Sequence, residues 1–290
     1  MSGGKNVMDE RRKAIEEQLK LVRERMSRVK HKIAVISGKG GVGKSLVTAN
    51  LAVALAKEGY RVGVLDADIH GPSIPKMLGV HGERMLAGPV GILPVKGPLG
   101  VEVASVDFLL PDESTPIIWR GPLKMHAIRQ FLSDVAWGEL DFLLIDLPPG
   151  TGDEPLSIAQ LIQDMDGFIL VTAPSELSEL VVKKAGSFAR KIGIPIIGVV
   201  ENMSWFKCPN CGAELYIFGK GAGERVAREL GVKLLGKIPI DPRISEATDE
   251  GIPFILKHPD SEAAREFMKI VRGIEEYIKN RESGDAGSKA

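Results

Sequence analysis

The chain has 290 residues, two cysteines, and 38 basic against 38 acidic side chains, so its formal net charge is zero. With 44% hydrophobic and 26% charged residues it has the composition of an ordinary globular protein, which excludes wholesale disorder. Zero net charge argues against a protein that coats nucleic acid, because that task needs a strong basic excess. No apolar run approaches the roughly 20 residues that span a bilayer, and the polar N-terminus does not resemble a signal peptide. We therefore expect a cytoplasmic protein that binds neither membrane nor nucleic acid.

Residues 1–31 are expected to form a charged helical arm. Within 8–30, apolar residues recur at alternating spacings of four and three, which is the pattern of one helix face: Ile15, Leu19, Val22, Met26 and Val29. The simplest interpretation is a solvated helix with one docked stripe. The alternative is an arm that binds a partner or a nucleic acid.

From residue 32 onward, short apolar runs alternate with helical patterns. The expected buried strands are 33–37, 61–66, 141–146, 168–172, 196–200 and 234–238, and the expected helices are 44–58, 122–134, 155–164, 175–192 and 220–231. Such alternation predicts an α/β fold, a doubly wound and mostly parallel sheet with helices on both faces. We expect one domain over 32–281 and a disordered tail over 282–290. The Pro- and Gly-rich segment 71–122, with short strands at 91–95 and 101–105, is typical of a lid or a partner surface.

A glycine-rich loop follows the first of these strands and opens the next helix. It fits the pattern G-x-x-x-x-G-K-[ST] of a phosphate-binding loop, with Gly38, Lys39, Gly40, Gly41, Val42, Gly43, Lys44 and Ser45. The glycines let successive backbone N–H groups point at phosphate oxygens, and the helix N-terminus adds its dipole. We expect Lys44 to neutralise the β- and γ-phosphates and the hydroxyl of Ser45 to ligate Mg²⁺.

Carboxylates follow two other strands. Asp146 is expected to hold Mg²⁺ through its waters, and Gly150, four residues later, to present its N–H to the γ-phosphate as a switch loop does. Asp66 and Asp68 are expected to assist the metal or to orient the attacking water.

Lys39 is a second lysine in the phosphate loop, and two lysines of one chain would crowd the same phosphates. It therefore indicates a face-to-face dimer in which Lys39 reaches the nucleotide of the partner.

These residues together resemble the deviant Walker A motif of the MinD, ParA and nitrogenase-iron-protein group of P-loop ATPases. Further motifs resemble the Mrp/ApbC-type iron–sulfur cluster carriers: Asp-Ala-Asp-Ile-His-Gly-Pro-Ser at 66–73, Asp-Leu-Pro-Pro-Gly-Thr-Gly-Asp at 146–153, Glu-Asn-Met-Ser at 201–204 and Cys-Pro-Asn-Cys at 208–211. The resemblance extends over about 32–254. It implies a homodimeric ATPase that hydrolyses ATP slowly, as a switch, and that binds a [4Fe–4S] cluster transiently before passing it to apo-proteins.

The resemblance also implies roles for individual residues. The run from Gly40 to Ser45 would bind nucleotide, extended by Leu46, which stands where the family usually has a second hydroxyl. Lys39 would act across the dimer and Asp68 would position the attacking water. Two further residues would lie at the adenine: Asn202, reading its edge, and Asp241, in the segment that flanks the base.

Cys208 and Cys211, the paired cluster ligands of that family by position, admit four interpretations from the residues alone. Two chains would supply four thiolates for a shared [4Fe–4S] cluster, or in the same way for zinc. The third interpretation is a redox-active pair, and the fourth is two inert cysteines.

The alternative function is a positioning ATPase of the MinD/ParA type, which uses a C-terminal amphipathic helix or a basic surface. The apolar stripe within 262–281 is expected to dock on its own domain instead.

Overall fold

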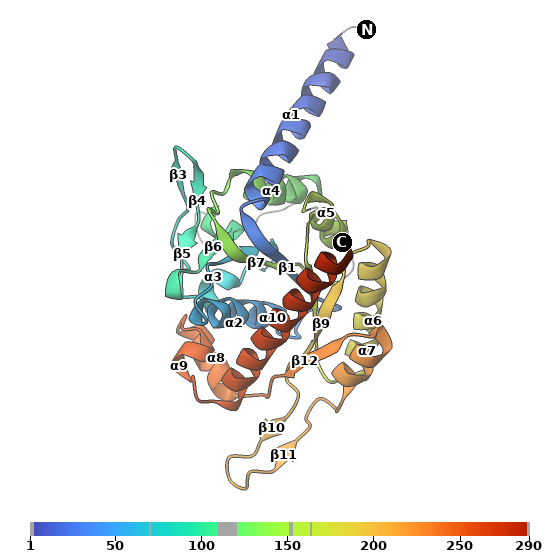
Figure 1. The fold of residues 1–290 in the computed structure, drawn as a ribbon. Helices are drawn as coiled ribbons and strands as arrows, with labels where there is room; N and C mark the ends of the chain where they lie inside the picture. The colour runs from blue at the N-terminus through green and yellow to red at the C-terminus, as the bar shows by residue number, and fades with distance from the viewer. Residues whose placement is uncertain (1–2, 70, 110–120, 151–152, 163, 289–290) are drawn as a thin grey trace.

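The computed structural model describes residues 3–69, 71–109, 121–150, 153–162 and 164–288, which surround one eight-stranded sheet (Figure 1). Across the sheet the strands are β12 (Lys233–Lys237), β9 (Ile196–Glu201), β8 (Gly167–Thr172), β1 (Val29–Ser37), β7 (Leu140–Asp146), β2 (Val62–Asp66), β6 (Glu102–Ser105) and β5 (Val95–Lys96). Every neighbouring pair is parallel except β5 with β6. The predicted doubly wound, mostly parallel α/β sheet is confirmed.

Helices cover both faces because successive residues of a buried strand point to opposite sides. On β1, Ile33 and Val35 pack with α2 (Lys44–Lys57), α3 (Ile74–Met77), α8 (Pro242–Asp249), α9 (Phe254–Lys257) and α10 (Glu262–Ser288). Their neighbours Ala34 and Ile36 pack on the other side with α1 (Gly3–Met26), α4 (Gly121–Asp134), α5 (Asp153–Leu161), α6 (Glu176–Lys191) and α7 (Ala222–Leu230). The core therefore has two layers, one on each face of the sheet.

The strand register brings the functional carboxylates to one edge of the sheet. Asp66 at the end of β2 lies opposite Asp146 at the end of β7, and Val35 of β1 also lies opposite Asp146. Because β1 ends two residues later, at Ser37, the glycine loop begins at this same edge. The carboxyl ends of parallel strands thus form the floor of the site.

The N-terminal arm is helical, but its boundaries differ from the prediction. The helix α1 ends at Met26 and β1 already begins at Val29, so the last residues assigned to the arm belong to the sheet. Val22 and Met26 are buried against the core, as expected of a docked stripe. Most of α1 extends away from the body (Figure 1).

The disorder predicted for 282–290 is wrong over 282–288, which form the last turns of α10. The docked face of this helix is buried through Ile278, and Arg281 donates to the carboxylate of Asp166 at 3.1 Å. Once the docked turns are formed, each further residue adds one helical hydrogen bond, so the helix extends past its last buried residue. Residues 289–290 lie outside the described ranges.

The segment 71–122 forms the edge of the sheet beyond β2. Its predicted strands appear as β4 (Gly91–Leu93), β5 and β6, and β4 pairs with β3 (Leu86–Gly88) in a separate hairpin. Short 3₁₀ turns follow β5 and β6, at Pro98–Gly100 and Val106–Leu109. The part over 110–120 lies outside the described residues, so the expected role as a lid or partner surface stays a prediction.

Candidate functional site

The glycine loop connects β1 to α2 and is shaped by two left-handed residues. Gly41 and Gly43 have φ values of +79° and +78°, a region that only glycine adopts without strain. Gly43 is also the N-cap of α2, so the unpaired N–H groups of the first helical turn face the loop. This is the backbone arrangement that binds phosphate in a P-loop.

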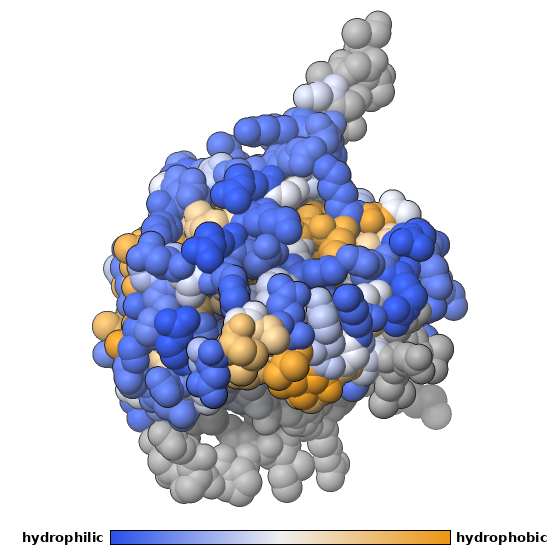
Figure 2. Space-filling view, turned by 90° about the horizontal axis from the view of Figure 1, so that it is seen from below, coloured by the Kyte–Doolittle hydropathy of each residue, from blue (hydrophilic) through white to orange (hydrophobic). Residues whose placement is uncertain are grey.

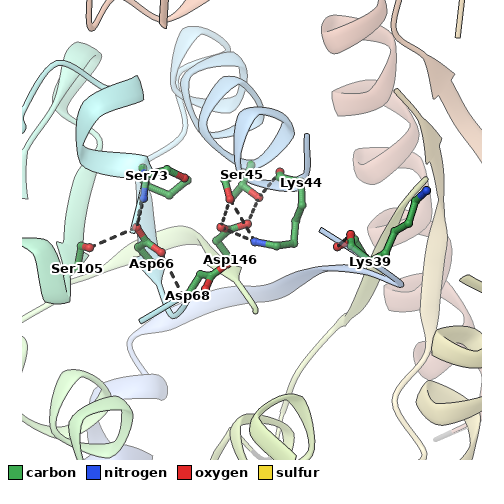
Figure 3. A network of polar contacts seen from close by, with 11 residues as sticks. Lys39, Lys44, Ser45, Asp66, Asp68, Ser73, Ser105 and Asp146 are labelled. Carbon is green, nitrogen blue, oxygen red and sulfur yellow. Dashed lines mark hydrogen bonds and ion pairs between the residues drawn. The ribbon is translucent and has the colours of Figure 1, made fainter. Parts of the chain in front are cut away.

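Lys44, Ser45 and Asp146 meet directly beneath this loop (Figure 3). The ammonium of Lys44 lies 2.6 Å from Oδ2 of Asp146, and the hydroxyl of Ser45 donates to the same oxygen at 2.6 Å. Thr48, one turn further along α2, donates to the other carboxylate oxygen at 2.8 Å. Lys44 and Asp146 are both buried. Buried groups of this kind are held in place by charge-assisted hydrogen bonds, which pre-position a cation, a hydroxyl and a carboxylate for phosphate and Mg²⁺.

Thr48 is a member of this cluster that the sequence interpretation missed. It lies four residues after Lys44, and residues at this spacing share one face of a helix. A hydroxyl at this spacing could have indicated that Thr48 belongs to the cluster.

Asp66 occupies a second buried position beside the cluster (Figure 3). It accepts hydrogen bonds from the backbone of Asp68, Ser73 and Ile74 at 3.1–3.3 Å and from the hydroxyl of Ser105 at 3.3 Å. Burial, followed by the nearby charge of Asp146, nevertheless raises the pKa of Asp66 to about 8, and the ammonium of Lys44 opposes that rise. Asp66 is therefore suited to hold a proton at neutral pH until a cation enters the site.

The raised pKa of Asp66 predicts a specific pH dependence of stability. Its carboxyl prefers the protonated form in the folded chain, so its contribution to the free energy of unfolding is greatest in acid and falls as the pH rises towards about 8. Asp66→Asn should remove that fall, measured by chemical denaturation between about pH 4 and 8, the window between the ordinary pKa of 3.8 and the raised pKa of about 8.

The matched control is Asp141→Asn, because hydrogen bonds from Arg61 lower the pKa of Asp141. Asp141→Asn should lower stability at neutral pH, and this loss should disappear as the pH falls into the acid range, where the wild-type carboxylate takes up a proton. An Asp66→Asn variant whose stability falls with pH as steeply as that of the wild type between about pH 4 and 8 would contradict the assignment.

Asp68 and Lys39 lie at the rim of the same edge. The half-buried Asp68 follows β2, and its backbone N–H donates to Asp66. Lys39 is also half-buried, and Figure 3 shows its side chain directed away from Lys44 and Asp146. The action of Lys39 on a partner's nucleotide stays a prediction.

The N–H of Gly150 is engaged within the protein. It donates to the carbonyl of Ser37 at 2.9 Å, and Gly150 itself has a φ of +100°. In this conformation the N–H is not available to a γ-phosphate, so the predicted contact requires the peptide to turn. The neighbouring Thr151 and Gly152, and His70 of the other motif, lie outside the described residues.

Asn202, expected at the adenine edge, lies against the phosphate loop. Its amide Nδ2 donates to the carbonyl of Val42 at 2.9 Å, and the residue is buried. A Cβ placed on Gly43 would lie 2.2 Å from that nitrogen. In this structure Asn202 therefore stabilises the phosphate loop, and its contact with adenine stays a prediction.

This close approach predicts that two neighbouring glycines differ in their sensitivity. At Gly41, nothing lies within 4 Å of an added Cβ, so Gly41→Ala should cost only the roughly 1–2 kcal/mol of a left-handed residue. Gly43→Ala carries the same φ cost and must also break the bond from Asn202 to Val42, which adds about 1 kcal/mol. Chemical denaturation of both variants measures this difference, and equal losses would contradict it.

The two cysteines occupy the turn of a separate hairpin. Its strands, β10 (Phe206–Lys207) and β11 (Glu214–Leu215), extend from the body of the molecule (Figure 1). Cys208 is half-buried and Cys211 exposed. Backbone N–H groups of Cys211 and Asn210 donate to the sulfur of Cys208 and lower the pKa of this thiol, because they stabilise the thiolate. A thiolate is the form that binds metal or cluster iron.

The described part of the same chain supplies no further metal ligand beside the cysteines. No group of three or more His, Cys, Asp or Glu side chains is placed to hold a metal among the residues that the structure describes. Four exposed apolar side chains begin four residues after Cys211: Leu215, Tyr216, Ile217 and Phe218. Figure 2, viewed from the side of the hairpin, shows apolar surface gathered in patches between polar residues. Such patches are typical of a surface that another protein covers.

Asp241 is the N-cap of α8 and lies beside the base of the hairpin. Its carboxylate accepts three bonds from Arg243, two of them from the guanidinium at 2.6 and 2.9 Å, and these lower the pKa of Asp241. A groove of about 400 Å³ separates this segment from the hairpin, with Phe206, Pro209 and Ile240 among its lining residues. The placement of Asp241 next to a bound base stays a prediction.

The parallel sheet, the glycine loop and the Lys44–Ser45–Asp146 cluster define a P-loop NTPase. A family model described as "ParA: NUBPL iron-transfer P-loop NTPase" matches residues 28–275. The "Iron-sulfur cluster carrier protein" of Saccharolobus solfataricus is 56% identical over 254 residues, covering 88% of this chain and 86% of the relative. That of Methanocaldococcus jannaschii is 55% identical over 277 residues, covering 96% and 95%. The chain belongs to this family of iron–sulfur cluster carrier P-loop NTPases.

Solved structures share the fold, and one of them contains a nucleotide. A nucleotide-binding protein from Archaeoglobus fulgidus in complex with ADP is 44% identical, with a TM-score of 0.72, over 80% of this chain and 91% of that one. The cell division ATPase MinD of Pyrococcus furiosus is 29% identical, with a TM-score of 0.59, over 85% of this chain and 98% of that one.

No helix within the described ranges combines the length and the apolar character needed to cross a membrane.

Proposed function

We propose that this chain is an ATP-hydrolysing carrier in which two copies share one [4Fe–4S] cluster between Cys208 and Cys211 of each and deliver it to apo-proteins. The observation that carries the proposal is that the P-loop cluster occurs together with a cysteine pair in an outer hairpin, and this pair provides only half of a four-ligand site. Four thiolates about a two-fold axis meet the needs of such a cluster.

The nucleotide half of the proposal rests on residues that already contact one another. Lys44 would transfer its ion pair from Asp146 to the β- and γ-phosphates, while Ser45 and Asp146 would hold Mg²⁺. The metal, when bound, neutralises the charge that develops on the phosphate oxygens. Asp68 would orient the attacking water, and Lys39 of one copy would approach the phosphates of the other.

The proposal of a shared cluster rests on the exposed position of the cysteine hairpin and on the thiolate form of Cys208. The hairpin holds Cys208 and Cys211 away from the sheet, where a second hairpin has access to them (Figure 1). The lowered pKa of Cys208 makes the thiolate, the form that binds metal, more accessible than in an ordinary cysteine. The exposed apolar residues from Leu215 to Phe218, beside the cysteines, form a surface that a second copy or a client protein could bind.

A positioning ATPase of the MinD/ParA type is the weaker candidate. Its use of a membrane would need a C-terminal amphipathic helix with an accessible apolar face. In α10 that face is buried on the domain itself, with Phe267, Ile270, Ile274 and Ile278 in the core. No observation favours this second function.

The proposal is tested by reconstituting the chain without oxygen and measuring iron, acid-labile sulfide and zinc per dimer, followed by transfer to an apo-enzyme that needs a [4Fe–4S] cluster. We expect about four iron and four sulfide per two chains and recovery of the apo-enzyme's activity. Zinc as the metal that survives reconstitution, or a bound cluster that no apo-enzyme accepts, would overturn it.

A further inference from the structure

The segment between β9 and the cysteine hairpin contacts the phosphate loop. It begins at Asn202, whose amide donates to the carbonyl of Val42, and reaches Cys208 only six residues later. Met203 follows, and the end of its side chain lies 3.8 Å from where a Cβ of Gly43 would be. Two consecutive residues of this segment therefore lie against the left-handed glycine that caps α2.

Backbone bonds hold the same segment against residues 238–240. Ser204 donates to the carbonyl of Ile238 at 2.9 Å, Ile240 donates to that of Trp205 at 2.6 Å, and Phe206 bridges to Ile240. Phe206 then begins β10, opposite Leu215 of β11. Backbone bonds to residues 238–240 thus hold the short stretch that joins the phosphate-loop contact to the base of the cysteine turn.

Met203 is the one residue of this connection with a strained backbone. Its φ of +58° is left-handed, and among the described residues only Leu99 shares this feature outside glycine. A left-handed non-glycine residue persists where its surroundings hold it, and such residues are frequent at switch regions. Here the surroundings are Gly43 and the Asn202 amide, both of which belong to the phosphate-loop contact.

We propose that Asn202 and Met203 form a mechanical link through which nucleotide at the phosphate loop changes the exposure of Cys208 and Cys211 in the same chain. The inference rests on the proposed function, since it assumes that nucleotide binds at Gly40 to Ser45. Phosphate draws the loop N–H groups inward, which moves the Val42 carbonyl and the amide of Asn202 that donates to it. Met203 then leaves its left-handed conformation, and the hairpin attached to it turns.

The experiment measures the rate at which a thiol reagent modifies the two cysteines of the reduced, metal-free full chain, with and without ADP and Mg²⁺. In the wild type we expect nucleotide to change this rate about fivefold or more, the usual range of coupling between sites. Asn202→Asp keeps the size of the side chain but replaces the donor to Val42 with an acceptor. It should abolish the response when ADP is present at a concentration that calorimetry shows to saturate the variant.

Two further variants complete the design. Ser204→Ala is the matched control, because Ser204 is equally buried in the same segment but its side chain bonds to Glu201. It should retain the nucleotide response. Met203→Gly relieves the left-handed strain without touching the amide, so the basal rate should rise and the response should shrink. This variant decides the matter if Asn202→Asp no longer binds nucleotide.

The outcomes separate the link from the function on which it rests. Nucleotide that binds the wild type without changing the thiol rate overturns the link alone, as does a full response in Asn202→Asp or Met203→Gly with nucleotide bound. Loss of the response in Ser204→Ala would also overturn it, by showing general loosening of the segment. A wild type that binds no nucleotide overturns the proposed function together with the link.

Discussion

Replacing Lys44 with alanine should abolish nucleotide hydrolysis and also weaken the fold. The lysine is the one cation within ion-pair distance of the fully buried Asp146, at 2.6 Å, among the ion pairs of the described residues. Removing one partner of a buried pair costs about 3–5 kcal/mol, less if the carboxylate takes up a proton instead. Loss of a positioned charge at the reacting phosphate lowers turnover by about 10²-fold or more. Phosphate release and chemical denaturation measure the two effects.

The double variant Lys44→Ala with Asp146→Ala separates these effects. Removing both partners should restore much of the lost stability, because no unpaired charge remains, but hydrolysis should stay absent. Lys39→Ala is the second comparison. Its side chain points away from the cluster, so stability and ADP binding should stay near wild type while hydrolysis falls. Full hydrolysis in Lys44→Ala would refute the assignment of the phosphate site.

Replacing Cys208 or Cys211 with alanine should remove the bound cluster and leave nucleotide binding intact. The chain has no other cysteine, so a dimer of either variant retains two thiolates for a cluster that needs four. We expect iron and sulfide contents near zero after anaerobic reconstitution, together with loss of the broad sulfur-to-iron charge-transfer absorption. ADP affinity, measured by calorimetry, should be unchanged.

Asn210→Ala is the matched control for the cysteine variants. Asn210 lies between the two cysteines and is exposed, and its contribution to the Cys208 thiolate comes from the backbone N–H, which alanine retains. This variant should therefore bind a cluster as the wild type does. Retention of iron and sulfide in a chain without either cysteine would show that other residues hold the metal.

The fold and the floor of the site were predictable because both depend on local patterns. Continuously apolar strands alternating with helices predict a parallel sheet, and parallel strands bring their carboxyl ends to one edge. Asp66 and Asp146 therefore had to lie near the glycine loop, and the register places them opposite one another.

The contacts that sequence did not predict are those made by single polar atoms across the fold. The amide of Asn202 reaches a carbonyl 160 residues away, and the N–H of Gly150 is taken by Ser37. No periodicity encodes such bonds, because they depend on how two loops pack. The helical residues 282–288 were mispredicted for a related reason, since a polar composition does not reveal that the helix before them is docked.

The ion pair between Lys44 and Asp146 has a consequence for the speed of nucleotide exchange. The protein neutralises its own phosphate-binding cation, so neither arrival nor departure of a nucleotide exposes a bare buried charge. Each event swaps one set of ionic partners for another of similar strength, which lowers the net affinity and also the barrier to release. Residence on the protein is then set less by the phosphates than by the contacts that hold the rest of the nucleotide.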